Sequence, residues 1–324
     1  MNSFTLVIRP TAPFQTPLHS DTIFGHICWA LRYLKGEDEL QKFIGRFEKD
    51  CAPLIISSGF PDGYLPMPIL RPMTIDEEDA ILNKHFGGAK LECYRKMKEL
   101  RKLSFISKSV FLNLKDRVTY YDIFDSHLAA PSLLDVDLGG RRKTVSIWRS
   151  SINRLTNTVA SGKLFPSLKT FYESGSAFTI YLKDDFFGKA LLDEVFEFVS
   201  RSGYGADKSV GCGAFEFELS NGWDLSNAEN PNTFITLSNY HPQKGEFARG
   251  HYDTVTKFGK LGGHWATGLP GGPHKMPVIM FSPGSSFSVD RAKDFYGRVV
   301  AGVHKANEEI VQYGLALPLM VRAL

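Results

Sequence analysis

The chain has 324 residues, of which 43% are hydrophobic and 13% aromatic, and its formal net charge is +3. This content is ample for a packed core and excludes a disordered protein, and the length suits two domains of ordinary size or one large one. The apolar runs fall short of the ~20 residues that a membrane span needs. Residues 1–10 lack the basic region and cleavage site of an export signal, so we expect a cytoplasmic protein without membrane contact.

The cysteines at positions 28, 51, 93 and 212 are far apart and form no CxxC pair. Reduced thiols are the default for cysteines spaced in this way, and a structural zinc site is not indicated. We therefore expect no bound metal.

Charge is distributed unevenly along the chain. Residues 254–289 contain no Asp or Glu, and within residues 94–115 Glu99 is the single acid. Segregated cations of this kind indicate a surface for a polyanion on an otherwise neutral body, although a solvated basic face is the alternative for any one tract. A third tract, residues 138–172, has no acid and carries Arg141, Arg142, Lys143, Arg149, Arg154, Lys163 and Lys169.

The first expected element is a strand over residues 4–8, where apolar and polar side chains alternate before Pro10. A helix follows, because Ser20 or Asp21 is a suitable N-cap and residues 23, 27, 30, 31 and 34 form an apolar stripe. The N–H groups at the start of this helix, near His19 and Ser20, would be available to an anion.

His19 and His26 raise the question of catalysis. Histidine can act as a general acid or a general base near neutral pH. Nothing in the neighbouring sequence marks either histidine as special, so we expect neither to be catalytic.

The middle of the chain has the character of an insertion. Residues 51–75 are irregular, with many prolines. Residues 76–86 and 90–103 are expected to form short helices, residues 118–124 a strand and residues 135–142 a turn. Together, residues 80–165 are interpreted as an insertion.

The most distinctive stretch is the glycine-rich loop within residues 201–218. Because glycines tolerate positive φ and leave backbone N–H groups uncovered, a chain of phosphates would fit against the main chain. Lys208 would then supply the counter-charge and Tyr204 a flat face for a base. The alternative is a flexible turn. The glycines are Gly203, Gly205, Gly211 and Gly213, and they also surround Ser209.

The surroundings of the loop argue against a nucleotide cofactor. Residues 186–199 have helical spacing and residues 215–218 alternate as in a strand. P-loops and dinucleotide-binding turns run strand, loop, helix, which is the opposite order. Position 208 is also Lys where the GxGxxG pattern needs Gly, so we expect no cofactor.

Residues 221–232 are the best domain boundary. Beyond it, strands are expected over residues 233–237, 278–281, 287–289, 298–303 and 315–321, and residues 257–265 form a second loop with glycine and lysine. We therefore expect one domain over residues 1–220 and a second over residues 221–324.

Several of these segments, in their order, resemble motifs of the RAMP superfamily of CRISPR proteins. Residues 20–25, Ser-Asp-Thr-Ile-Phe-Gly, resemble the start of the first helix in Csm-type RAMP subunits. Residues 149–158 resemble an Ile-Asp-Arg-x-Thr segment in which Asn153 replaces Asp, residues 170–182 a strand entry, and residues 283–287 a Gly-Ser-x-Phe turn. The glycine loop resembles the hallmark of the superfamily, from which Cys212 departs.

Over nearly the whole chain, the resemblance is to the subunit-four family of the type III-A CRISPR Csm complex. It implies an α+β fold of two ferredoxin-like (RRM-like) domains with the insertion as a projecting β-hairpin thumb. It further implies a non-catalytic subunit that binds the 5′ handle of the CRISPR RNA, docks the large Csm subunit and adjoins a backbone RAMP subunit. The candidate RNA-binding residues are His19, Ser20, Arg149, Asn153, Arg154, Gly203, Tyr204, Gly205, Lys208, Ser209, Gly211, Gly213, Lys257, Lys260 and His264.

Two functions from other classes stay open. One is a RAMP endoribonuclease that processes CRISPR RNA, and the other is an assembly scaffold without RNA contact. The equivalent subunit of another type III complex would carry much the same motifs.

Overall fold

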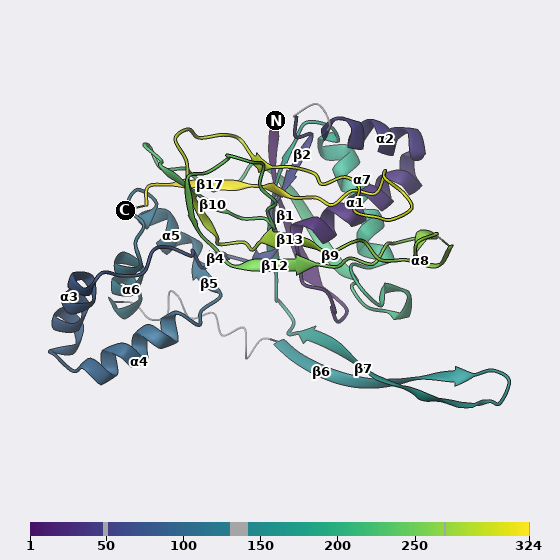
Figure 1. Ribbon diagram of the computed structural model, residues 1–324, viewed down its shortest axis with the longest axis horizontal. Helices are drawn as coiled ribbons and strands as arrows, with labels where there is room; N and C mark the ends of the chain where they lie inside the picture. The colour runs from purple at the N-terminus through teal and green to yellow at the C-terminus, as the bar shows by residue number, and fades with distance from the viewer. Residues whose placement is uncertain (48–50, 130–141, 269, 324) are drawn as a thin grey trace.

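A computed structural model describes residues 1–47, 51–129, 142–268 and 270–323. The predicted turn at residues 135–142, apart from its last residue, and Arg141 of the basic tract lie outside these ranges. The fold is mixed α/β, with several sheets. Figure 1 shows a central body of sheets and helices, a helical lobe at one end and a long hairpin that projects from the body.

The first sheet is antiparallel, with the order β2 (Leu54–Ile56), β8 (Phe178–Asp184), β1 (Asn2–Pro10) and β9 (Phe215–Asn221), and the short β3 (Phe60–Pro61) also pairs with β8. Helix α1 (Ser20–Lys35) follows β1, and α7 (Gly188–Ser202) joins β8 to β9. The connectivity β1–α1–β2–β8–α7–β9 is a βαββαβ pattern. Helix α2 (Glu37–Gly45) packs against α1 (Figure 1).

The second sheet has the order β11 (Arg249–His251), β14 (Ser286–Ser288), β10 (Thr233–Thr236) and β17 (Pro318–Val321). If the four strands of each sheet are numbered by their order in the chain, both sheets have the order second, third, first, fourth. Two small ribbons accompany the second sheet: β12 (Thr254–Lys257) with β13 (Val278–Phe281), and β15 (Tyr296–Gly297) with β16 (Leu315–Ala316). Within the described residues of this half, α8 (Trp265–Gly268) has only four residues, so the connections are mostly irregular.

The strand expected over residues 298–303 is wrong. Only Val300 pairs there, in an isolated bridge with Gln312. Gly297 and Gly302 have φ of 90° and 65°, and such positive values interrupt an extended strand on both sides.

The two halves share one core. The largest buried cluster contains Leu6, Ile180 and Leu182 from the first sheet together with Leu319 and Val321 from the second. Polar groups also cross between the halves, since the Ser238 hydroxyl donates to Ile56 O at 2.7 Å and the Tyr313 hydroxyl accepts from Ile56 N at 2.9 Å. The boundary between residues 220 and 221 stays a prediction.

The insertion predicted over residues 80–165 begins inside a helical lobe. The lobe is built from α3 (Ile75–Phe86), α4 (Lys90–Leu100), α5 (Lys108–Leu114) and α6 (Tyr120–Ala129), beside the ribbon of β4 (Tyr64–Pro66) and β5 (Phe105–Ser107). The strand expected over residues 118–124 is wrong, because α6 begins at Tyr120. The Thr119 hydroxyl accepts from Asp122 N at 3.0 Å, which is the contact of a helix N-cap. Val118 alone pairs as a strand residue, with Ala323.

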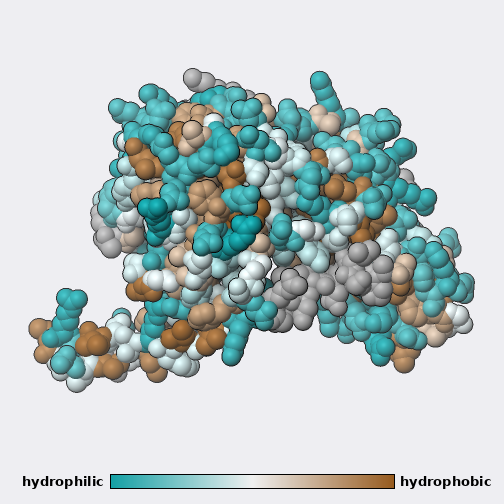
Figure 2. All heavy atoms as spheres, turned by 180° about the vertical axis from the view of Figure 1, so that it is seen from behind, coloured by the Kyte–Doolittle hydropathy of each residue, from teal (hydrophilic) through white to brown (hydrophobic). Residues whose placement is uncertain are grey.

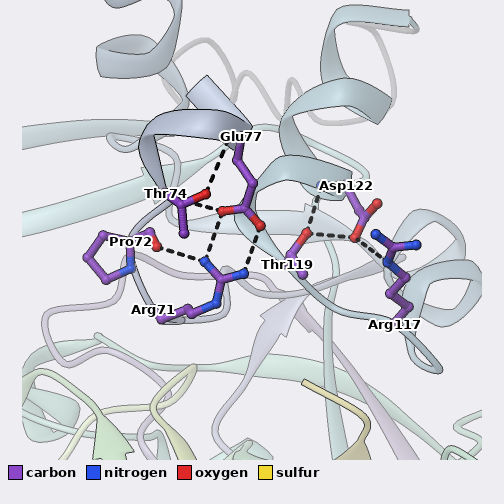
Figure 3. Close-up of polar contacts among 7 residues, drawn as sticks. All are labelled: Arg71, Pro72, Thr74, Glu77, Arg117, Thr119 and Asp122. Atoms are coloured by element: carbon purple, nitrogen blue, oxygen red, sulfur yellow. Dashed lines mark hydrogen bonds and ion pairs between the residues drawn. The ribbon is translucent and has the colours of Figure 1, made fainter. Parts of the chain in front are cut away.

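The start of α3 is held by three side chains (Figure 3). Thr74 and Glu77 form a capping box, in which the Thr74 hydroxyl accepts from Glu77 N and the Glu77 carboxylate accepts from Thr74 N. The same carboxylate binds the Arg71 guanidinium through two hydrogen bonds of 2.7 and 2.8 Å. The hydrogen bonds from Arg71, above all, lower the pKa of Glu77 to about 2.

A hairpin of β6 (Arg142–Asn153) and β7 (Thr158–Tyr172) follows, with a register shift between Ser150 and Ile152. It extends past residue 165, the predicted end of the insertion. It projects from the body in Figure 1, and hydrophobic side chains lie along it in Figure 2. The exposed hydrophobic side chains on this hairpin are Ile147, Trp148, Ile152, Leu155, Val159, Leu164, Phe165, Leu168 and Phe171.

We predict that Glu77→Ala destabilises the helical lobe by about 1–2 kcal/mol, because it removes both a cap and a bidentate ion pair. Unfolding by urea, followed by circular dichroism, measures this change. Asp79→Ala, at an exposed acid of the same helix, is the control. Equal stability of the two variants would contradict a structural role for the Arg71–Glu77–Thr74 contact.

Candidate nucleic-acid interface

The segment between β1 and α1, residues 11–19, contacts the hairpin, the glycine loop and, through His19, Lys257 of the second half. Phe14 exchanges two backbone hydrogen bonds with Thr170 of the hairpin, at 2.9 and 2.8 Å. Pro13 O and Pro17 O accept hydrogen bonds from Gly213 N and from the Tyr204 hydroxyl, both in the glycine loop. We call residues 11–19 the linking segment.

The glycine loop, residues 203–213, is closed on itself. Tyr204 N donates to Gly213 O at 2.8 Å, and a Cβ on Gly213 would lie far inside van der Waals contact with the Tyr204 backbone. Gly203 and Gly205 are also closely packed, since their Cβ atoms would lie 2.6 Å from Cys212 O and from Thr16 Cβ. Gly211, with φ of 84°, has open space instead.

The structure contradicts the expectation that these glycines leave N–H groups uncovered for phosphates. The N–H groups of Gly203, Gly205 and Ala206 donate to Val199 O, to His26 Nε2 and to the Thr16 hydroxyl. The glycines are therefore required by close packing and by positive φ at this turn.

Tyr204 is not a platform for a base. Its side chain is buried, its hydroxyl donates to Pro17 O at 2.7 Å, and its ring packs against Phe14 and His26. The residues at the tip of the loop, Lys208 and Ser209, are exposed to solvent. The neighbouring loop atoms still desolvate the Lys208 ammonium in part, which lowers the pKa of Lys208. Within the loop, these two side chains are the ones best placed to meet a ligand.

Arg149 is engaged with the glycine loop. Its guanidinium lies 2.7 Å from the Asp207 carboxylate, which also accepts a hydrogen bond of 2.7 Å from the Gln15 amide. The Asp207 carboxylate thereby joins Arg149, past the middle of β6, to the linking segment and the loop. Asn153 and Arg154 lie at and beyond the far end of β6, so the structure does not bring them to this place.

His26 supports the loop from α1. Its Nε2 accepts a hydrogen bond of 2.9 Å from Gly205 N, which requires a neutral ring. Burial, and then the charge of Lys208, lower the pKa of His26 to about 3. Nothing in the sequence indicates this hydrogen bond between His26 and Gly205, which becomes visible only once the loop is placed beside α1.

At the start of α1, the expectation that Ser20 or Asp21 is the N-cap is wrong. His19 is the N-cap residue, without a side-chain cap. The Ser20 hydroxyl accepts from Asn239 N, and the Asp21 carboxylate pairs with Lys257 Nζ at 3.0 Å. These groups join the helix to the second half of the chain, and the Ser20 side chain is buried.

His19 and Lys257, two of the predicted RNA-binding residues, are in contact in the structure. Lys257 Nζ lies 2.6 Å from His19 Nδ1. Burial lowers the pKa of His19 to about 4, aided by the charge of Lys257 and opposed by Asp21. Because the ammonium is already paired with Asp21, Lys257 is a structural cation here.

The second loop, residues 257–265, lies against Trp29 of α1. Gly262 and Gly263 pack on the indole, where a Cβ on either would lie 2.6–2.7 Å from its ring atoms. The His264 ring contacts Trp29 and Trp265 edge to face. Lys260 is exposed and forms an isolated bridge with His274.

The candidate residues thus divide into two groups. In the first group, His19, Ser20 and Lys257 lie together at the start of α1, and Arg149 lies against the glycine loop. The side chains of these four residues are engaged with other residues of the protein. Lys208, Ser209, Lys260 and Arg154 are exposed. Gln15, Thr16 and Asp207 were not predicted as site residues. Only Asp207 could have been found from the sequence, because it is an acid inside a loop of glycines and a lysine.

No group of three or more His, Cys, Asp or Glu side chains among the described residues is arranged to hold a metal ion. No helix in the described ranges is long and apolar enough to cross a membrane.

Comparisons with known proteins place this fold. A family model described as the RAMP superfamily matches residues 11–216. A chain of the Csm1–Csm4 cassette crystallised with AMPPNP is 19% identical, with a TM-score of 0.60, and the match covers 99% of both chains. A chain of the Csm3–Csm4 subcomplex of the type III-A CRISPR-Cas interference complex is 14% identical, with a TM-score of 0.54, and the match covers 98% of this chain and 99% of that one. No curated protein sequence matches the chain.

We predict that Gly213→Ala and Gly211→Ala differ strongly in stability. Alanine at Gly211 meets only the cost of positive φ, about 1–2 kcal/mol, whereas at Gly213 it also collides with backbone that cannot move aside, which adds at least about 2 kcal/mol. Denaturant unfolding of both variants measures the difference. Similar losses in the two would show that the loop is not closed at Tyr204 and Gly213.

The depressed pKa of His26 predicts a dependence of stability on pH. Between pH 6.5 and about 3 the unfolded chain binds a proton at this position and the folded chain does not, so stability falls as the pH falls, by about 1.4 kcal/mol per unit. Denaturant unfolding at pH 7 and pH 5 should show that His26→Gln, which keeps an acceptor for Gly205 N, loses less stability than the parent. His251→Gln, at an exposed histidine, is the control, and identical pH profiles for all three proteins would refute the assignment.

Proposed function

The chain belongs to the RAMP superfamily, and we propose that it is the guide-RNA-binding subunit of a type III-A CRISPR interference complex that corresponds to Csm4. In this role it binds the 5′ handle of the CRISPR RNA. It docks the large Csm subunit on one side and adjoins a backbone RAMP subunit on another. Such a complex would act in the cytoplasm.

The observation that carries this proposal is the extent of the shared fold. The fold of a chain in the Csm1–Csm4 cassette extends over 99% of both chains, so the linking segment, the hairpin and the second half all fall within the match. The pairs in these structures, Csm1 with Csm4 and Csm3 with Csm4, support a large-subunit partner and a RAMP partner for this chain. The repeated strand order supports two ferredoxin-like halves, of which the second lacks long helices in its described part.

The exposed cations support an RNA ligand. Single-stranded RNA is held by phosphate contacts to Lys and Arg, with unstacked bases on aromatic rings. Lys208 at the tip of the glycine loop and Lys260 in the second loop are exposed, and the exposed cations on the hairpin include Arg142, Lys143, Arg154 and Lys163.

We also propose that the chain has no catalytic role. His26 is neutral and accepts a hydrogen bond from the main chain, and His19 lies against the Lys257 ammonium. With pKa values lowered to about 3 and about 4, neither ring would carry a proton for a leaving group near neutral pH.

The proposal predicts a salt-dependent affinity for single-stranded RNA that depends on Lys208. A phosphate contact contributes ~0.7 to the slope of log affinity against log salt, so Lys208→Ala should lower the slope by about that amount and Lys208→Arg should preserve it. Filter binding of a labelled repeat RNA over a salt series measures this. Lys42→Ala, at an exposed lysine of α2 paired with Glu39, is the control.

Other outcomes of the same assay distinguish the alternatives. A parent protein with no RNA affinity would support a scaffold, and cleavage of the repeat RNA in the presence of a chelator would support a ribonuclease. Either result would overturn the proposed function.

A further inference from the structure

The ribbon of β12 and β13 has two different faces. On the inner face, Val255, Val278 and Met280 pack into a small core cluster, and Lys257 extends to His19. The outer face is exposed at Thr256 and Ile279, whereas Phe281 at its far end packs against Tyr240 and Phe287. Ile279 pairs with Thr256 across the ribbon, and the side chain of Ile279 is 64% exposed.

Phe258 continues this outer surface at the end of β12. Its side chain is 58% exposed, and its ring lies parallel to that of His274, with the centroids 5.1 Å apart and the planes at 8°. His274 is itself exposed. Since Lys260 and His274 form a backbone bridge, the two rings are held by the chain beneath them and not only by each other.

The charge around these rings favours a polyanion. Residues 254–289 contain no acid, so β12, β13 and the chain that joins them carry no negative side chain. Asp253 precedes β12 at the end of the strand away from Phe258. Of the lysines in this tract, Lys257 pairs with Asp21, and Lys275 Nζ donates to Val311 O. Lys260 remains exposed beside His274.

We propose that Phe258 and His274 form a stacking platform for an unpaired base of single-stranded RNA, with Lys260 contacting an adjacent phosphate. An aromatic face beside a lysine is the usual arrangement for such ligands, because every base has a π-face and every nucleotide a phosphate. The proposal rests on the proposed function and assigns one base-binding position within it. It is separate from the glycine loop, whose one aromatic residue, Tyr204, is buried.

The test uses the full chain and an oligoadenylate RNA of about 12 nucleotides, within the site sizes of single-strand binders. Phe258→Ala and Phe258→Leu should each weaken binding about tenfold, whereas Phe258→Trp should bind at least as well as the parent, because only tryptophan keeps an aromatic face. His274→Ala is a second variant at the platform. Ile75→Ala, at a 79% exposed side chain beside the acids of α3, is the control.

The outcomes separate this proposal from the function beneath it. If the parent binds RNA and Lys208→Ala weakens it while every Phe258 variant binds like the parent, the platform is wrong and the proposed function stands. If Phe258→Leu keeps full affinity while Phe258→Ala does not, the surface is an apolar contact and the stacking proposal is overturned. A parent that binds no RNA overturns both.

Discussion

The position of the linking segment, residues 11–19, is the constraint on which the rest of the interface depends. The segment is hydrogen-bonded to the glycine loop, to the hairpin and, through His19, to Lys257 of the second half of the chain. Gln15 alone bonds both Ser167 of the hairpin and Asp207 of the loop. Gly205 and Gly213 lack side chains because the segment and the loop main chain leave no space for them. Lys208 and Ser209 lie between the two closely packed ends of the loop and are exposed.

A second set of contacts, centred on Asp21, joins the two halves. One oxygen of its carboxylate accepts hydrogen bonds from Lys257 and Asn239, and the other accepts from Gln312. The Asp21 and Lys257 side chains are only 7% and 14% exposed. Removing one partner of a buried pair leaves an uncompensated charge, which costs more than the pair contributes. This pair therefore specifies how the start of α1 meets the second half, and it explains why His19 and Lys257 are engaged within the protein.

Local patterns predicted the regular elements better than they predicted the site. Alternation over residues 4–8 and the apolar stripe after residue 20 correctly indicated β1 and α1, because each buries one face. The pattern wrongly predicted a strand over residues 118–124, because a short apolar run fits a strand or a helix equally well. The Thr119 hydroxyl caps a helix there. The pattern also failed for Ser20, Asp21 and Tyr204, whose partners lie far away in the sequence. The buried hydrogen bonds of Tyr204 and the Asp207–Arg149 pair depend on tertiary packing, which no local spacing encodes.

In the proposed function, the guide RNA passes over the exposed tip of the glycine loop in the assembled complex. Ultraviolet crosslinking of the CRISPR RNA within a purified type III-A complex that contains this chain, followed by mass spectrometry of the crosslinked peptides, tests this most directly. We expect crosslinks from the 5′ handle to a peptide that contains Lys208 and Ser209. Crosslinks of the handle to other subunits alone, with none to this chain, would contradict it.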